Sequence, residues 1–225
     1  MQKKEFKRHL KIRYDRIIKC LIFLLFFVFA VMYILNVRVK NIYIVGNKYV
    51  KDQEIIELAG ISDYPKMIEI NSLTIKNKLA EENIISEVNV EKKNTSLILT
   101  VKEAKPLYYD NSERATILEN GKKINKKYNV PIVVNYIPDT ILEKFRKALA
   151  KVDDDNLLKI SEIKYDPNID DERFLLTMTD GNYVYINIKK FELINNYLTI
   201  ISNFKDKKGI LYLDSGSHFE VLQKS

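Results

Sequence analysis

The side chains that most often carry out catalysis are scarce in this sequence. It has two histidines, His9 and His218, and one cysteine, Cys20. The histidines lie far apart, so they do not have the spacing of a metal site, and Cys20 lies in an apolar stretch rather than beside a base that could activate it. The glycines are isolated, so no phosphate-binding loop is expected. We therefore predict no catalytic residue, no cofactor and no metal ion.

Two short stretches allow a weak chemical interpretation. The serines of 215–217 could supply a nucleophile, but Ser-Gly-Ser is first of all a turn sequence. The three aspartates at 153–155 could bind calcium, but the glycine and the later glutamate of a calcium loop are missing. A solvated acidic turn is the interpretation that the sequence favours. The function is therefore expected to depend on binding surfaces, which the helices and strands of the chain must build.

The N-terminal part of the chain predicts a transmembrane helix at residues 17–36. Ile17 to Leu35 is apolar except for Lys19. At about 1.5 Å per residue, these residues match a hydrocarbon core about 30 Å thick. The alternative is a buried core helix, but Leu21 to Val31 has no polar face. Cleavage as a signal peptide is the other alternative, and no small-x-small pattern follows Leu35.

Charge predicts the orientation of this helix. Residues 1–19 carry eight basic and two acidic side chains, whereas Arg38 and Lys40 are the nearby basic residues on the other flank. Basic flanks remain in the cytoplasm, so residues 1–16 are expected to be a cytoplasmic tail and the C-terminus to be extracellular. The net charge of the whole chain is +7, of which the first 19 residues supply +6. The remainder is almost neutral, so we expect no nucleic-acid binding.

The residues after the helix predict two folded units of an α+β ectodomain. The first, 37–104, has the order β-α-α-β-β, and the second, 105–222, is strand-rich with flanking helices; 223–225 form the C-terminal end. In the first unit we expect strands at 40–45, 85–93 and 96–103 and helices at 52–59 and 72–82. In the second we expect strands at 115–118, 122–124, 131–136, 160–165, 174–179, 183–188, 210–213 and 217–222, and helices at 139–151 and 190–204.

The first unit resembles a POTRA domain. The resemblance depends on Val45-Gly46-Asn47 at the end of the first strand, on Glu54, Ile55 and Gly60 in the first helix, and on 97–103 ending in Glu103 with Pro106 three residues later. A basic tail, one membrane helix, a POTRA domain and a strand-rich domain together resemble the FtsQ/DivIB family of cell-division proteins. The segments 117–121, 130–132, 176–181 and 209–219 are similar to that family's β domain, but Asn135 and Asn187 stand where the family often has glycine.

The resemblance implies a non-enzymatic scaffold of the divisome in the plasma membrane at the division septum. Its expected partners are proteins of the FtsL and FtsB/DivIC types, bound outside the membrane, and the septal peptidoglycan synthase is a further candidate. Through these partners the protein would help to regulate septal peptidoglycan synthesis. The alternatives are another POTRA-bearing interaction protein of secretion or sporulation, and an extracytoplasmic enzyme.

Two strand edges are the candidate partner-binding sites. The first is the 85–93 strand, whose outward residues are expected to be Glu87, Asn89 and Glu91. The second is the C-terminal segment, which is expected to pair with a partner strand because a last strand often lies at a sheet edge. Its candidate contact residues are Ile210, Leu211, Tyr212, Leu213, His218, Phe219 and Val221. Alternatively, the apolar residues of this segment complete the core.

Overall fold

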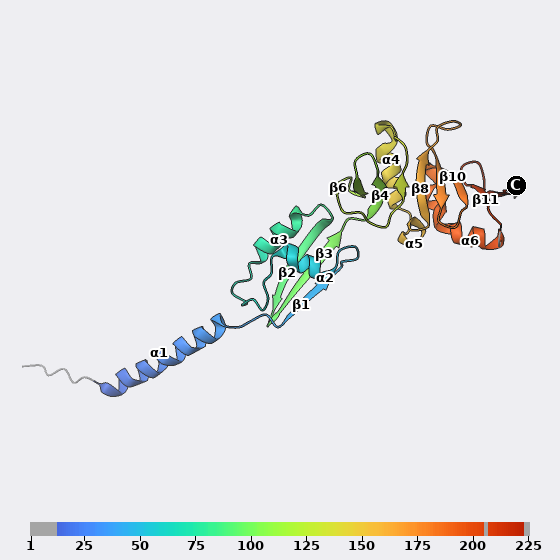
Figure 1. The fold of residues 1–225 in the computed structure, drawn as a ribbon. Coiled ribbons are helices and arrows are strands. Elements are labelled where there is room, and N and C mark those ends of the chain that lie inside the picture. Colours follow the sequence, from blue (N-terminus) through green and yellow to red (C-terminus); the bar gives the residue numbers. More distant parts are fainter. Residues whose placement is uncertain (1–12, 205–206, 223–225) are drawn as a thin grey trace, which may run out of the picture.

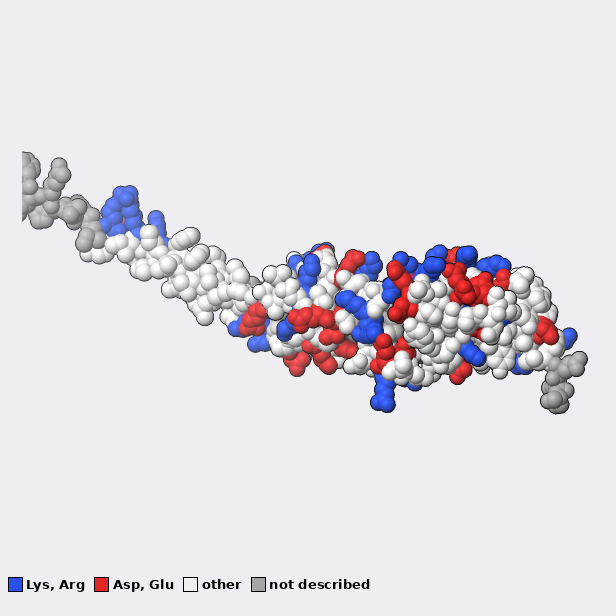
Figure 2. Space-filling view, turned by 90° about the horizontal axis from the view of Figure 1, so that it is seen from above, with Lys and Arg blue, Asp and Glu red and all other residues white. Residues whose placement is uncertain are grey.

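The protein is described by a computed structural model that covers residues 13–204 and 207–222. Most of the expected cytoplasmic tail, His9 included, and the C-terminal end 223–225 lie outside these residues. The molecule is elongated, with α1, a three-stranded unit and a nine-stranded unit following one another in space (Figure 1). Lysine, arginine and acidic side chains are mixed over the two folded units, whereas α1 is white along most of its length (Figure 2).

Helix α1 spans Tyr14–Leu35, three residues earlier than the apolar stretch begins. None of its residues is buried, and it is the one helix of the described residues that is long and apolar enough to cross a membrane. Its 22 residues extend about 33 Å as a helix, which matches the thickness of a bilayer core. Basic side chains gather at its N-terminal end, beside the grey trace in Figure 2.

The first unit has the β-α-α-β-β order that the sequence predicts. Its elements are β1 (Asn41–Val45), α2 (Asp52–Ala59), α3 (Ser72–Glu81), β2 (Ile85–Lys93) and β3 (Ser96–Glu103). The sheet order is β1-β3-β2, with β1 parallel and β2 antiparallel to β3. Gly60 ends α2 in the left-handed conformation, and the Asn71 side chain accepts hydrogen bonds from the first turn of α3. Leu97 and Leu99 of the central strand are fully buried under the helices.

The second unit is a mixed sheet in the order β12-β11-β10-β9-β8-β7-β4-β5-β6. Its strands are β4 (Pro106–Asp110), β5 (Ala115–Leu118), β6 (Lys123–Ile124), β7 (Ile132–Val133), β8 (Ile160–Tyr165), β9 (Arg173–Met178), β10 (Tyr183–Asn187), β11 (Gly209–Tyr212) and β12 (His218–Val221). Helix α4 (Asp139–Ala150) and the 3-10 helix η1 (Ile188–Asn196) contribute to its core. Phe145 of α4 stacks on Phe174 of β9 at 4.6 Å, and Phe191 of η1 meets both rings edge-on.

Four expectations for this unit need correction. The predicted 190–204 helix is the 3-10 helix η1, then one α-helical stretch, α6 (Tyr197–Ile201), and the short η2 (Ser202–Phe204). The buried residues Ile188, Phe191, Ile194 and Tyr197 recur every third residue, which is the period of a 3-10 helix, and Leu198 is half exposed. The 131–136 strand is reduced to Ile132–Val133, β4 was not foreseen, and the aspartates at 153–155 begin the helical turn α5 (Asp154–Leu157).

The two units are joined by buried apolar and charged contacts. Leu118 of β5 lies fully buried in the core of the first unit. Asp154 of α5 accepts hydrogen bonds from the Tyr49 hydroxyl at 2.7 Å and pairs with Lys105 at 2.8 Å and with Lys48. Burial raises the pKa of Asp154, but the two ammonium groups and the hydroxyl outweigh burial, so its pKa lies well below the usual range. The carboxylate therefore stabilises the junction in its charged form.

Candidate functional site

Strand β12 is the outermost strand of the nine-stranded sheet, and none of the described residues pairs with its outer side. The Leu222 N–H donates to the Lys208 carbonyl at 2.9 Å, which identifies these opposite residues as a hydrogen-bonded pair. Hydrogen-bonded and non-bonded pairs alternate along an antiparallel ladder. The backbone N–H and C=O groups of Phe219 and Val221 therefore point away from β11. A second strand could pair with them at what we call the β12 edge, His218–Val221.

The β12 edge continues into a row of aromatic rings on the outer face of the sheet. The Tyr212 ring lies between those of Tyr185 and His218, with ring centroids 5.5 and 4.5 Å apart. The Tyr212 hydroxyl donates to a Glu220 carboxylate oxygen at 3.1 Å. Desolvation, followed by this carboxylate, raises the pKa of Tyr212. Each of these rings exposes part of one face or edge, so the row offers apolar contact area beside free backbone groups.

Arg173 continues this aromatic row on the same face of the sheet. Its guanidinium carbon lies 3.6 Å from the centre of the Tyr185 ring, a cation–π contact. The same guanidinium pairs with Asp166 at 3.0 Å and with Asp214 at 2.7 Å, and Arg173 is only 5% exposed. Burial raises the pKa of Asp214, but Arg173 and the Ser215 N–H outweigh it, so the pKa is lowered. Asp214 lies two residues after the end of β11, so this ion pair fixes the start of the turn toward β12.

The start of β11 is fixed by a buried polar network. The Asn182 side chain is 1% exposed, accepts a hydrogen bond from the Gly209 N–H at 2.9 Å, and donates to the Tyr197 hydroxyl at 3.1 Å. Tyr197 in turn donates to Asp180. The start of β11 is thus tied to the turn before β10 and to α6, and the chain beyond its end is tied to Arg173 of β9. The β12 edge is presented by a rigid strand rather than by a free tail.

The structure divides the seven C-terminal candidates into two groups. Ile210, Tyr212 and His218 lie on the outer face, whereas Leu211 and Leu213 are 1% exposed and belong to the core. Because β11 pairs with β10 and β12 on its two sides, the expectation that 210–213 lies at a free edge is corrected. Phe219 and Val221 lie on the inner side of the edge strand, with the Phe219 ring 4.5 Å from that of Phe204.

The three candidates of the first unit lie elsewhere, on β2. Glu87, Asn89 and Glu91 are all exposed, and within the described part of the chain β2 pairs only with β3. Lys102 pairs with Glu87 at 2.9 Å, and the Asn89 amide donates to Glu91 at 2.8 Å. Strands β2 and β12 belong to different sheets, so the ten candidates form two separate surfaces rather than one site.

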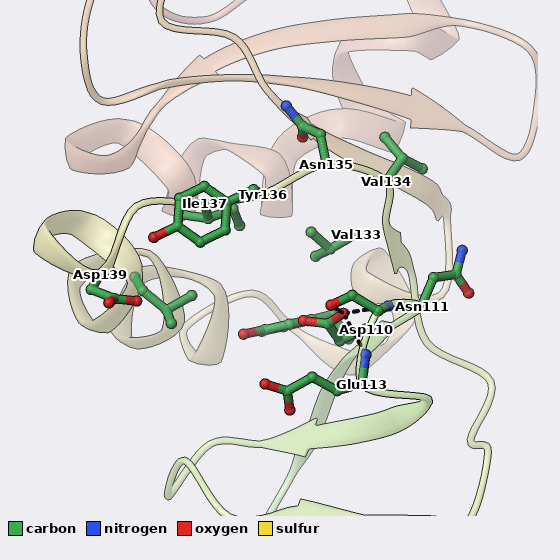
Figure 3. A pocket seen from close by; sticks show the side chains of 12 residues that line it. Asp110, Asn111, Glu113, Val133, Val134, Asn135, Tyr136, Ile137 and Asp139 are labelled. Carbon is green, nitrogen blue, oxygen red and sulfur yellow. Dashed lines mark hydrogen bonds between the residues drawn. The ribbon is translucent and has the colours of Figure 1, made fainter.

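A cavity of about 590 Å³ opens between the turn after β4 and the loop before α4 (Figure 3). The carboxylates of Asp110, Glu113 and Asp139 line it, and the first two have hydrogen-bond or ion-pair partners within the protein. Asp110 caps its own turn by accepting hydrogen bonds from Ser112 and Glu113, and Glu113 pairs with Lys123. Asn135 uses its amide to bridge both backbone groups of Tyr165. The polar side chains that line the cavity thus mainly stabilise the surrounding loops by hydrogen bonds within the protein. Among the described residues, no group of three or more potential metal ligands occurs.

Sequence reasoning missed the residues that support the β12 edge. Asp214, Arg173 and Tyr185 were not named among the candidate residues. Arg173 lies 41 residues from Asp214 in the sequence, so no local pattern links them. The alternation of β10 does place Tyr183 and Tyr185 on one face, and that signal could have indicated a second aromatic strand beside Tyr212.

Comparison with known proteins identifies a matching family model and several similar proteins. Residues 37–103 match the family described as POTRA domain, FtsQ-type. The chain is 26% identical to the cell division protein DivIB of Geobacillus kaustophilus, over 91% of this chain and 84% of that one. It is 25% identical to DivIB of Bacillus anthracis, over 82% and 74% of the two chains. A solved structure, the major extracytoplasmic domain of the trans isomer of DivIB from Geobacillus stearothermophilus, matches with 22% identity and a TM-score of 0.38, covering 45% of this chain and 93% of that one.

Proposed function

Since this chain belongs to the FtsQ/DivIB family of cell-division proteins, we propose that it is a non-enzymatic scaffold of the division machinery. The scaffold binds proteins of the FtsL and FtsB/DivIC types outside the membrane, and through them it influences septal peptidoglycan synthesis. The single observation that carries this proposal is the unpaired β12 edge beside an aromatic row. Such an edge offers main-chain hydrogen bonds for affinity and side-chain contacts for specificity.

In this function a partner segment adds a tenth strand next to β12. The free N–H and C=O groups of Phe219 and Val221 supply the main-chain bonds, and Tyr212 and His218 supply contact area on the outer face. The opposite end of the sheet, β6, does not compete for this partner strand. It lies against the first unit, where the Asn83 amide donates to the Lys123 carbonyl. In the same proposal the β2 edge is a second docking surface, where Glu87, Asn89 and Glu91 contact the partner.

A proline substitution tests strand addition directly. Val221→Pro removes one N–H that points away from β11, so the β11–β12 ladder keeps its own hydrogen bonds. Val221→Thr keeps the N–H and the branched shape and is the matched control. We expect Val221→Pro to reduce recovery of the FtsL- and DivIC-type proteins from membranes at least about tenfold, which corresponds to about 1.4 kcal/mol. Equal recovery with the proline and threonine variants, both folded, would reject strand addition at β12.

The orientation in the membrane belongs to the same proposal. The basic side chains at the N-terminal end of α1 support a cytoplasmic N-terminus and an extracytoplasmic β12 edge. A reporter enzyme that is active only outside the cytoplasm, fused after Ser225, should be active. Activity of the same reporter from an N-terminal fusion instead would reverse the orientation. A fluorescent fusion tests the septal location, which a diffuse signal along the whole envelope would contradict.

A further inference from the structure

The loop between α2 and α3 is held against the chain that leaves α1. The Met67 N–H donates to the Val37 carbonyl at 2.8 Å, and the Val39 N–H donates to the Pro65 carbonyl at 2.9 Å. The Arg38 guanidinium also donates to the Tyr64 carbonyl at 2.9 Å. Three hydrogen bonds therefore fix residues 64–67 to residues 37–39. We call residues 61–70 the juxtamembrane loop.

This attachment places the juxtamembrane loop at the surface of the bilayer that α1 spans. The apolar part of α1 ends at Leu35, only two residues before Val37. Two residues reach at most about 7 Å, so the loop lies within roughly 10 Å of the outer end of the apolar helix. The polar headgroup region on one side of a bilayer is several ångströms thick. In Figure 1 the loop joining α2 to α3 comes down beside the end of α1.

The juxtamembrane loop exposes large apolar side chains in this position. Tyr64 is 77% exposed and Ile68 is 60% exposed. Tyr64 also has a left-handed backbone conformation, with a φ of 51°, which a bulky residue adopts only when its surroundings hold it there. The Arg38 hydrogen bond to its carbonyl is one such constraint. The loop is thus built to direct an aromatic and an aliphatic side chain away from the core.

Two basic side chains lie beside these apolar residues. Arg38 is exposed in the segment to which the loop is attached, and Lys66 lies between Tyr64 and Ile68 in the loop, which also carries the exposed acidic residues Asp63 and Glu69. Tyrosine is favoured where one end of a side chain is apolar and the other is wet, as at a membrane surface. Arginine and lysine there can place their charges beside lipid phosphates while their stems remain in apolar surroundings. The chemistry of the loop therefore matches a phospholipid interface.

We propose that the juxtamembrane loop inserts Tyr64 and Ile68 into the outer interfacial region of the bilayer, with Arg38 and Lys66 beside lipid phosphates. The POTRA domain then has two attachments to the membrane, α1 and this loop, instead of one flexible link. Two attachments limit its tilt, and so they hold the β12 edge at a defined height above the membrane. This inference depends on the membrane span and not on the partner assigned to the β12 edge.

A fluorescence experiment on the full-length chain tests the proposal, because the sequence contains no tryptophan. Tyr64→Trp and Ile68→Trp each introduce a single reporter. Tyr136→Trp is the matched control, because Tyr136 is 73% exposed but belongs to the distant nine-stranded unit. Each variant is placed in nanodiscs of phosphatidylcholine and phosphatidylglycerol, with or without bromine atoms on the upper part of the acyl chains. Bromine quenches only tryptophans that lie close to it.

We expect brominated lipid to reduce the emission of Trp at positions 64 and 68 by about twofold, and the emission at position 136 hardly at all. Acrylamide in the water should quench position 136 more strongly than either loop position. Arg38→Ala in the Tyr64→Trp background should weaken the bromine effect, since it removes the hydrogen bond that holds the loop and one charge near the phosphates. Loop tryptophans that respond to bromine and acrylamide as position 136 does would overturn the proposal, and would leave the patch to a protein partner.

Discussion

The β2 edge and the β12 edge offer the same backbone groups but protect them differently. Strand β2 has nine residues, and its outward side chains Glu87, Asn89 and Glu91 are polar and exposed. Strand β12 has four residues and stands beside Tyr212 and His218, whose rings stack 4.5 Å apart. Charged residues along an edge discourage pairing with another chain, whereas aromatic neighbours favour it.

This difference indicates how one chain can present two edges without aggregating. The long β2 edge is kept soluble by charge, and a partner there must satisfy Glu87 and Glu91 with positive side chains. The β12 edge is short, which limits nonspecific pairing, and it is backed by the Arg173 and Asn182 networks. We therefore expect β12 to contribute most of the binding free energy and β2 to contribute a smaller part.

Replacing Phe219 should have the largest effect, and the effect should fall on stability. The Phe219 ring lies on the inner side of β12 against Phe204 and the core. It packs so closely on Gly209 that a side chain added there would clash with the tip of the ring. We expect Phe219→Ala to reduce the free energy of unfolding by about 3 kcal/mol. Urea unfolding of the purified protein measures it. Phe219→Leu, which keeps most of the apolar volume, is the control and should lose less than half as much.

Replacing Tyr212 should instead affect binding. Its ring is on the outer face and only partly buried, so Tyr212→Ala should weaken partner affinity by about 2 kcal/mol, or roughly 30-fold, with a smaller change in unfolding. Partner titration and thermal unfolding on the same preparations distinguish the two effects. If Tyr212→Ala and Phe219→Ala both melt early, or both bind normally, β12 is not the capture site.

The junction between the two units gives a pH-dependent prediction. Asp154 has a lowered pKa in the folded protein, so its contribution is present above the unfolded value near 4 and is lost as the pH falls toward the folded value. At pH 7 we expect Asp154→Asn to cost about 1.5 kcal/mol of unfolding free energy. As the pH falls from about 4 to 3 the difference between the two proteins should shrink. A constant difference from pH 7 to pH 3 would show that the carboxylate charge does not matter. Asp155→Asn, at an exposed neighbour, is the control.

The smallest effect is expected at the β2 edge. Lys93 and Ser96 flank a two-residue turn and so form a hydrogen-bonded pair, and by alternation the N–H of Val90 points away from β3. Val90→Pro should therefore remove one edge donor and reduce partner affinity by about threefold. Val90→Thr keeps this donor and should bind like the unaltered protein. Unchanged affinity in a folded Val90→Pro variant would mean that β2 is a solvated edge.

The sequence by itself determined those features that depend on local patterning. A run of apolar residues predicted α1, and alternation predicted β2 and β3 with the same bounds that the structure has. Gly60 ends α2 in the left-handed conformation and Asn71 caps α3, and both geometries depend on local chemistry. The POTRA resemblance followed from the same short-range signals.

Only the tertiary structure decided which groups remain free. Residues 210–213 have the apolar pattern of an edge or of a core strand, and it is the pairing of β11 with both β10 and β12 that buries Leu211 and Leu213. Asp214 lies 41 residues from its partner Arg173, and Tyr49 lies 105 residues from Asp154, so no local pattern could identify these pairs. The attachment of residues 64–67 to 37–39 likewise needs the folded chain. Burial and long-range pairing are properties of the whole packed molecule, because they depend on which surfaces meet when the chain has folded.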